Sequence, residues 1–110
     1  MGSFTISRRS NSEYQFTLRA NNNETILSSE GYPAKSDCHH GIESVRLNAA
    51  DEARYDRRTA SNGQYYFNLS ATNGEVIGSS EMYDSTAARD KGIAAVKENA
   101  AGATIDDQSA

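Results

Sequence analysis

The chain has little of several features that restrict where a protein works. Its 110 residues include one cysteine, one proline and no tryptophan. The single cysteine, Cys38, cannot form an intramolecular disulfide, which is typical of a reducing compartment. No run approaches the roughly 18 apolar residues of a membrane span, and the first residues lack a charged-then-apolar leader. We therefore expect a cytoplasmic protein with no membrane partner.

The charge balance disfavours a nucleic-acid partner. The chain has 15 acidic and 11 basic residues, a formal net charge of −4, whereas surfaces that bind nucleic acids are usually basic and clustered. The basic pairs Arg8-Arg9 and Arg57-Arg58 lie near expected turns and offer few cations for phosphate binding. Nucleic-acid binding therefore remains only a disfavoured alternative.

What the chain does contain is an internal repeat. Residues 14–49 and residues 65–100, related by a shift of 51, are identical at 16 of 36 positions. Two independent units of about 50 residues would each lie near the lower size limit for folding alone, so two repeats that share one core are the simpler arrangement. We expect one domain over 1–110, made of repeat 1 at 4–52 and repeat 2 at 53–107.

Each repeat predicts strands joined by tight turns. Tyr, Phe, Leu and Ala alternate over residues 14–20 and again over 65–71, which is the period of a half-buried strand. Asn22-Asn23 and Asn73-Gly74 follow, and both predict a tight hairpin. Asn73-Gly74 suits a two-residue type I′ turn, whereas Asn23 in the place of glycine leaves the turn type of the first hairpin open. A further short strand precedes each hairpin, so three antiparallel strands per repeat are expected.

A helix is expected after each hairpin. In repeat 2, Ser85 is a suitable N-cap for a helix over Thr86–Asn99. Gly41 and Gly92 fall in the middle of the two helices, where glycine costs roughly 0.5–1 kcal/mol relative to alanine. The same cost in both repeats predicts a very close approach of the helix backbone to the sheet or to the other helix.

A short extended segment follows each helix, at residues 53–56 and 103–106. The first of these segments has to close repeat 1 and also begin repeat 2. We therefore expect it to be a central strand that ties the two halves into one sheet.

The repeated segments resemble a known family. The runs NGEVIGSSEMY…GIAAVKENA, NNETILSSEGY…GIESVRLNA and ARYDRRTASNGQYYF are similar to the YegP-like family of small bacterial proteins of uncharacterised function. The resemblance covers essentially residues 4–107. It implies an α+β fold of two tandem β3-α-β repeats in one largely antiparallel sheet, with both helices on one face and the closing strands exchanged between repeats. Such a chain would be an internal pseudo-dimer and a monomer.

The most repeated polar motif is Ser-Ser-Glu-x-Tyr, at the expected strand-to-helix junctions. Loops at such junctions often carry function, but no histidine is repeated beside these serines to activate them. Serine and glutamate can instead satisfy backbone groups at a turn while the tyrosine packs its ring. As binding candidates the motif supplies Ser29, Glu30, Tyr32, Ser80, Glu81 and Tyr83. We assign no catalytic residue.

A second polar cluster, Asp37-Cys38-His39-His40, is a poor metal site. Successive side chains on a helix diverge by about 100°, so adjacent histidines cannot face one ion. Repeat 2 has Ala88-Arg89-Asp90-Lys91 in its place. We therefore expect no metal and no other cofactor.

The remaining candidate is the sheet face opposite the helices. An uncovered antiparallel face can contact water or a partner, and here it would present Gln15, Thr17, Arg19, Gln64, Tyr66, Asn68 and Ser70. Tyr66 and Arg19 form the pair with stacking potential. The function remains unknown from the sequence, and a non-enzymatic binding module that uses this face or a sheet edge is favoured, with a protein or a small polar ligand as partner. The alternative is a small-ligand binder or enzyme with two quasi-equivalent sites at the junctions.

Overall fold

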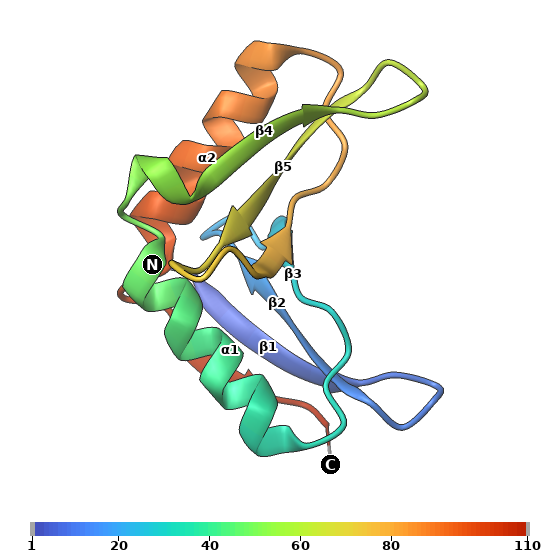
Figure 1. The fold of residues 1–110 in the computed structure, drawn as a ribbon. Helices are drawn as coiled ribbons and strands as arrows, with labels where there is room; N and C mark the ends of the chain where they lie inside the picture. The colour runs from blue at the N-terminus through green and yellow to red at the C-terminus, as the bar shows by residue number, and fades with distance from the viewer. Residues whose placement is uncertain (1, 110) are drawn as a thin grey trace.

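Seven strands form one open sheet, and two helices cover one of its faces (Figure 1). A computed structural model describes residues 2–109. Along the chain lie β1 (Ser3–Arg8), β2 (Tyr14–Arg19), β3 (Thr25–Ser28), α1 (Lys35–Asn48), the 3₁₀ helix η1 (Glu52–Arg54), β4 (Tyr55–Thr59), β5 (Tyr65–Ser70), β6 (Val76–Ser79), α2 (Thr86–Asn99) and β7 (Thr104–Asp107). The order across the sheet is β4-β5-β6-β3-β2-β1-β7, and only the β1–β7 pair is parallel. The expected α+β fold of two repeats in a largely antiparallel sheet is confirmed.

The two repeats meet at the centre of the sheet. Ser28 of β3 pairs with Ser79 of β6, the residue 51 positions further on. A pseudo-twofold axis therefore passes between these two serines. At the sheet edge, β7 of repeat 2 lies against β1 of repeat 1, with Phe4 opposite Ile105. The closing strand of repeat 2 is thus exchanged onto repeat 1.

The middle extended segment does not take the central place expected for it. Residues 53–56 form the end of η1 and the beginning of β4, and β4 is an edge strand that pairs only with β5. The prediction of a central strand was wrong, because these residues are the first strand of repeat 2 and cannot also lie beside it.

The hairpin turns share a geometry that differs from the expected type I′ turn. Ser12, Asn23, Gly63 and Gly74 have φ angles of 70°, 68°, 86° and 87°. A type I′ turn needs two consecutive residues with positive φ, and within residues 2–109 none of these four has such a neighbour. In the first repeat, Asn23 N–H donates to Ala20 O and Ala20 N–H donates to Glu24 O, both at 2.9 Å. Each turn is therefore a type I turn closed by one left-handed residue.

An asparagine stabilises each of these turns from inside. Its side-chain oxygen accepts a hydrogen bond from the backbone N–H two residues further on, at 3.0–3.1 Å. Such Asx bonds favour a local turn over continued strand. The four asparagines are Asn11, Asn22, Asn62 and Asn73.

The core lies between the sheet and the helices. Phe4, Phe16 and Phe67 are fully buried, and the apolar side of each helix covers them, with Ile42 in α1 and Ile93 in α2. The helix predicted over Thr86–Asn99 has those bounds, and Ser85 Oγ accepts from Ala88 N–H as its cap. Among residues 2–109, neither helix has the length and apolar content that crossing a membrane requires.

At one pair of equivalent positions, 27 and 78, the two repeats cannot have the same residue. Leu27 is fully buried beside the pseudo-twofold axis, and its equivalent is Gly78. A Cβ atom at position 78 would lie 2.7 Å from Leu27 Cγ. The space at the axis therefore holds one leucine side chain, and the symmetry of the repeats has to break there.

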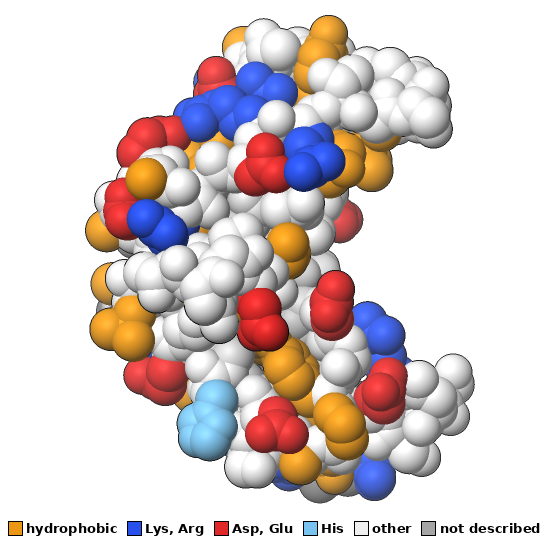
Figure 2. All heavy atoms as spheres, viewed as in Figure 1, with side chains coloured by type: hydrophobic (Ala, Val, Ile, Leu, Met, Phe, Trp, Pro, Cys, Tyr) orange, Lys and Arg blue, Asp and Glu red, His pale blue; other side chains and the backbone are white. Residues whose placement is uncertain are grey.

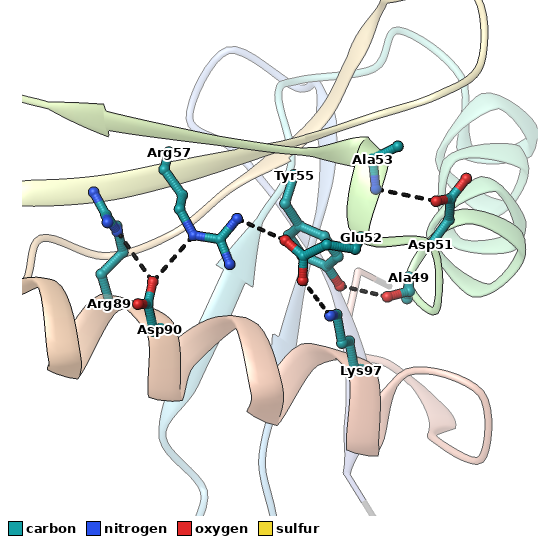
Figure 3. A network of polar contacts seen from close by, with 9 residues as sticks. All are labelled: Ala49, Asp51, Glu52, Ala53, Tyr55, Arg57, Arg89, Asp90 and Lys97. Carbon is teal, nitrogen blue, oxygen red and sulfur yellow. Dashed lines mark hydrogen bonds and ion pairs between the residues drawn. The ribbon is translucent and has the colours of Figure 1, made fainter.

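An ion-pair network holds the segment between the repeats on α2 (Figure 3). The Glu52 carboxylate accepts hydrogen bonds from Arg57 at 2.6 Å and from Lys97 at 2.5 Å. Arg57 also pairs with Asp90 at 3.1 Å. Hydrogen bonds from Arg57 and Lys97 lower the pKa of Glu52 to about 2. The Tyr55 hydroxyl joins the same segment to the end of α1, by donating to Ala49 O at 2.6 Å.

Exchanging Leu27 and Gly78 should restore most of the stability that each single substitution loses. Gly78→Leu should destabilise the protein by about 1–3 kcal/mol through overpacking, and Leu27→Gly by about 2–5 kcal/mol through lost packing. In the double variant the new leucine would fill the vacated space. Its destabilisation should therefore be about 1–3 kcal/mol smaller than the sum of the two single destabilisations. Urea denaturation measures all four proteins. If the destabilisations of the two single variants simply add in the double variant, the two positions do not share one space at the axis.

The network should make stability sensitive to acid. The folded state lowers the pKa of Glu52 from 4.5 to about 2, so its stabilising contribution is complete above about pH 4.5 and is lost as the pH falls towards 2. We expect the free energy of unfolding to decline less between pH 5 and pH 2.5 in Glu52→Gln than in the wild type. Because Glu52 is exposed, the difference should be small. Glu98→Gln, outside the network, should keep the wild-type slope.

Candidate functional site

The serines of the Ser-Ser-Glu-x-Tyr motif bind backbone groups. Ser29 Oγ accepts from Phe16 N–H at 2.9 Å and donates to Glu30 O at 2.8 Å. Ser80 Oγ makes the equivalent bonds with Phe67 N–H and Glu81 O at the same distances. These bonds complete the main-chain pairing where β3 and β6 end, which supports the structural interpretation of the two serines.

The tyrosines of the motif account for the glycines in the middle of the helices. Tyr32 stacks on Phe16 with ring centroids 6.3 Å apart, and a Cβ atom on Gly41 would lie 2.5 Å from the Tyr32 hydroxyl oxygen. Gly92 lies equally close to the Tyr83 hydroxyl. A close approach to the sheet or to the other helix was expected. The nearest neighbour of each glycine is a tyrosine side chain, and at Gly41 the sheet is also close, because a Cβ atom there would lie 3.0 Å from Phe16 Cε2 of β2. Burial raises the pKa of both tyrosine hydroxyls.

A cleft of about 420 Å³ lies beside the first junction and combines groups from both repeats. It is lined by Glu30, Tyr32, Glu75, Val76 and Ile77. Glu30 and Glu75 are exposed, and both add to the effect of burial in raising the pKa of the Tyr32 hydroxyl. Glu75 was not among the residues expected at this site, because it belongs to the hairpin of the other repeat.

The second junction repeats this combination of groups. Burial is the main cause that raises the pKa of Tyr83, and the charges of Glu81 from repeat 2 and Glu24 from repeat 1 add to it. Each tyrosine is therefore influenced by a glutamate of its own repeat and a glutamate of the other, and Tyr32 also by Asp37 of its own repeat. Such a site can attract a cation and donate from a neutral phenol. A paired nucleophile and base is not among the cleft residues.

The Asp37-Cys38-His39-His40 run is not assembled into a metal site. Cys38 is fully buried, and burial together with Asp107 raises the pKa of its thiol to about 11. The thiol is therefore protonated and unreactive at neutral pH. Within residues 2–109 no three His, Cys, Asp or Glu side chains are grouped to hold a metal ion.

The open sheet face carries a continuous row of short polar side chains. Strand register places one residue of each strand in this polar row, which runs Asp56, Asn68, Ser79, Ser28, Thr17, Thr5 and Asp106. The axis between Ser28 and Ser79 relates the six other members of the row in pairs, while Asp106 on β7 has no counterpart. Asn68 is joined to Ser79 by a 2.7 Å hydrogen bond.

Tyr66 and Arg19 do not touch. They lie on β5 and β2, which β6 and β3 separate, so three strand spacings of about 4.8 Å place them about 14 Å apart. β5 and β2 run in opposite directions, so both residues lie on the same side of the polar row. A ligand would have to span the centre of the sheet to reach both.

The outline of the molecule is hollowed between the tips of the β1–β2 and β4–β5 hairpins (Figure 2). Acidic side chains lie along this hollow, at the right of the view, with a basic side chain among them. A surface of this shape and charge does not provide the basic stripe that nucleic acids require.

Comparison with known sequences gives a family match over most of the chain. A family model described as "Domain of unknown function (DUF1508)" matches twice, at residues 10–56 and 60–107. A UPF0339 protein of Bordetella pertussis is 51% identical over 109 residues, covering 99% of this chain and 98% of that protein. The UPF0339 protein YegP of Escherichia coli K12 is 47% identical over 108 residues, covering 98% of each.

Solved structures agree with the fold. The solution NMR structure of yegP from E. coli, described as a protein of unknown function, has a TM-score of 0.94 at 47% identity, covering 98% of this chain and 93% of that one. The solution NMR structure of a UPF0339 protein from Shewanella oneidensis has a TM-score of 0.93 at 49% identity, covering 98% of this chain and 92% of that one. These uncharacterised relatives indicate no specific function. The double match and the near-half identity over the full length show that the chain belongs to the DUF1508 family of UPF0339, YegP-like proteins.

Proposed function

We propose that the protein is a non-enzymatic binding module that contacts a protein or polar ligand through the open face of its sheet. The observation that carries the proposal is the polar row, which crosses all seven strands without a large side chain and is accessible at every member except the buried Thr5. Hydroxyl and amide groups both donate and accept hydrogen bonds, so the row suits a partner rich in the same groups. The hollow between the hairpin tips would hold such a partner over the row (Figure 2).

The proposal includes the state and place of the protein. The two repeats already complete each other's core, so we infer a monomer that is an internal pseudo-dimer. The lone buried thiol of Cys38 suits the reducing cytoplasm. Catalysis is not part of the proposal, because the repeated serines bond to backbone groups and the thiol is protonated.

A second candidate function rests on the cleft. Glu30 and Glu75 supply negative charge from both repeats, while Val76 and Ile77 supply an apolar wall. This combination favours a small cationic ligand with an apolar part. The Ser-Ser-Glu-x-Tyr junctions would then be quasi-equivalent binding sites.

A bulky cation in the middle of the polar row should remove partner binding through the open face. Thr17→Lys and its equivalent Asn68→Lys should lower the recovery of specific partners from native extracts at least about fivefold, since central contacts are commonly worth 1 kcal/mol or more. Quantitative mass spectrometry of proteins retained by the tagged chain measures this recovery. Tyr66→Ala and Arg19→Ala test the flank of the row.

The matched control for this experiment is Ala94→Lys, on the exposed side of α2. It adds the same charge away from the open face and should leave recovery unchanged. Unchanged recovery with both row variants would rule out the open face as the contact surface. Loss of binding with Glu30→Gln and Glu75→Gln instead would favour the cleft.

A further inference from the structure

Strand β4 ends the sheet where its equivalent, β1, has a neighbour. β1 pairs with β2 on one side and with β7 on the other, whereas β4 pairs only with β5 (Figure 1). The 51-residue shift relates β1 to β4 and relates β7 to residues 53–56. Since residues 53–56 already form the end of η1 and the start of β4, no strand within residues 2–109 occupies the place beside β4 that β7 occupies beside β1.

The free edge of β4 has hydrogen-bonding groups in defined places. Beside β1, the Ile6 carbonyl accepts a hydrogen bond from Gln108 N–H at 2.8 Å, and the equivalent of Ile6 is Arg57. Main-chain groups of successive residues point to opposite sides of a strand, so Arg57 N–H and C=O face the free edge. An added segment would bond to Arg57 as the β7 segment bonds to Ile6.

The pairing of β7 with β1 shows which side chains such a place accepts. Ile105 lies opposite Phe4, and the Arg46 guanidinium lies 5.4 Å from the centre of the Phe4 ring. Beside β4 the arrangement recurs, with Lys97 5.5 Å from the centre of the Tyr55 ring. An apolar side chain in the position of Ile105 would therefore lie beside Tyr55.

The place also has a cationic end. In β7, Asp107 pairs with Lys35 at 2.9 Å and interacts electrostatically with the buried Cys38. The equivalent of Cys38 in repeat 2 is Arg89, and the equivalent of Ile6, opposite Asp107, is Arg57. In a segment bound beside β4 as β7 is bound beside β1, the residue equivalent to Asp107 would follow the apolar residue by two positions. A carboxylate there would lie beside the guanidinium groups of Arg57 and Arg89.

Those two guanidinium groups already share a carboxylate. Asp90 lies 3.1 Å from Arg57 and 3.5 Å from Arg89 (Figure 3). The Arg89 side chain is only 12% exposed, while Asp90 is 52% exposed. Asp90 can therefore turn towards solvent and leave Arg89 and the Nε atom of Arg57 to a second carboxylate, while Glu52 keeps its bond to Nη1 of Arg57.

We propose that the outer edge of β4 binds an extended segment of a partner protein, parallel to β4, in which an apolar residue is followed two positions later by Asp or Glu. Main-chain bonds to Arg57 supply affinity, and the side chains beside Tyr55 and between the two arginines supply specificity. The charged residues along β4 disfavour its pairing with another copy of itself. This site is separate from the open face and does not depend on it.

The sequence of β7 provides the probe, because the structure shows it on an edge of this kind. The peptide Ala-Thr-Ile-Asp-Asp-Gln-Ser, copied from residues 103–109, is titrated into the ¹⁵N-labelled full chain. We expect the largest amide shift changes at Arg57 and Thr59, with a change at the Arg89 side chain. Changes confined to β1, with release of β7, would mean strand exchange and would overturn the proposal.

A matched pair of variants separates the main chain from the side chain. Arg57→Ala and Arg57→Pro both remove the guanidinium, but only proline removes the outward N–H, which β5 does not use. Arg57→Ala should weaken binding about threefold, as expected for an exposed ion pair, and Arg57→Pro should abolish it. Equal binding by the two variants would overturn the proposal. Amide spectra of β5 verify that both remain folded.

Two further measurements use the wild-type protein and so do not depend on how a variant folds. Methylating the peptide nitrogen that corresponds to Gln108 N–H should abolish binding, and Asn in place of the aspartate corresponding to Asp107 should weaken it about threefold. Undiminished binding of the methylated peptide would refute strand addition. A dimer that Arg57→Pro abolishes would assign the edge to a second copy and refute a partner segment.

Discussion

Each helix packs on strands of both repeats, and the rest of the structure depends on this shared core. α1 lies on β2 of its own repeat and on β5 and β6 of the other, while α2 lies on β5 and on β3. Only one residue pair, Ser28 with Ser79, joins β3 to β6 in the sheet ladder. The helices and the exchanged strand β7 therefore hold the halves together, and neither half could bury its apolar face alone.

Joining two equivalent units in one chain has physical consequences at two places. At the axis, two leucines would compete for one space, so Leu27 is opposed by Gly78. At the edge, the residues that would close repeat 1 are needed to begin β4. The duplication thus gives a nearly twofold structure with one strand position filled and its equivalent open, and this asymmetry is the basis of the proposed edge site.

Much of the local structure follows from the sequence pattern. The helix ends at Ser85 and Asn99, the alternation in β2 and β5, and the close contact at Gly41 and Gly92 were predictable, because capping and periodicity act over a few residues. The type I′ turn at Asn73-Gly74 was predicted wrongly. An Asn-Gly pair suits several turns, and which one forms depends on where the flanking strands pair.

The candidate sites were only partly predictable. Glu30 and Tyr32 stand out in the repeated motif, but Glu75 does not, because nothing in the sequence shows that the hairpin of one repeat reaches the junction of the other. Tyr66 and Arg19 share a face as expected, yet two strands separate them. The sequence by itself determined the strands, the helices and the twofold repeat, since these arise from contacts between near neighbours in the chain. Only the tertiary structure decided which groups meet across the axis and which edge stays open, because those depend on how the two repeats pack together.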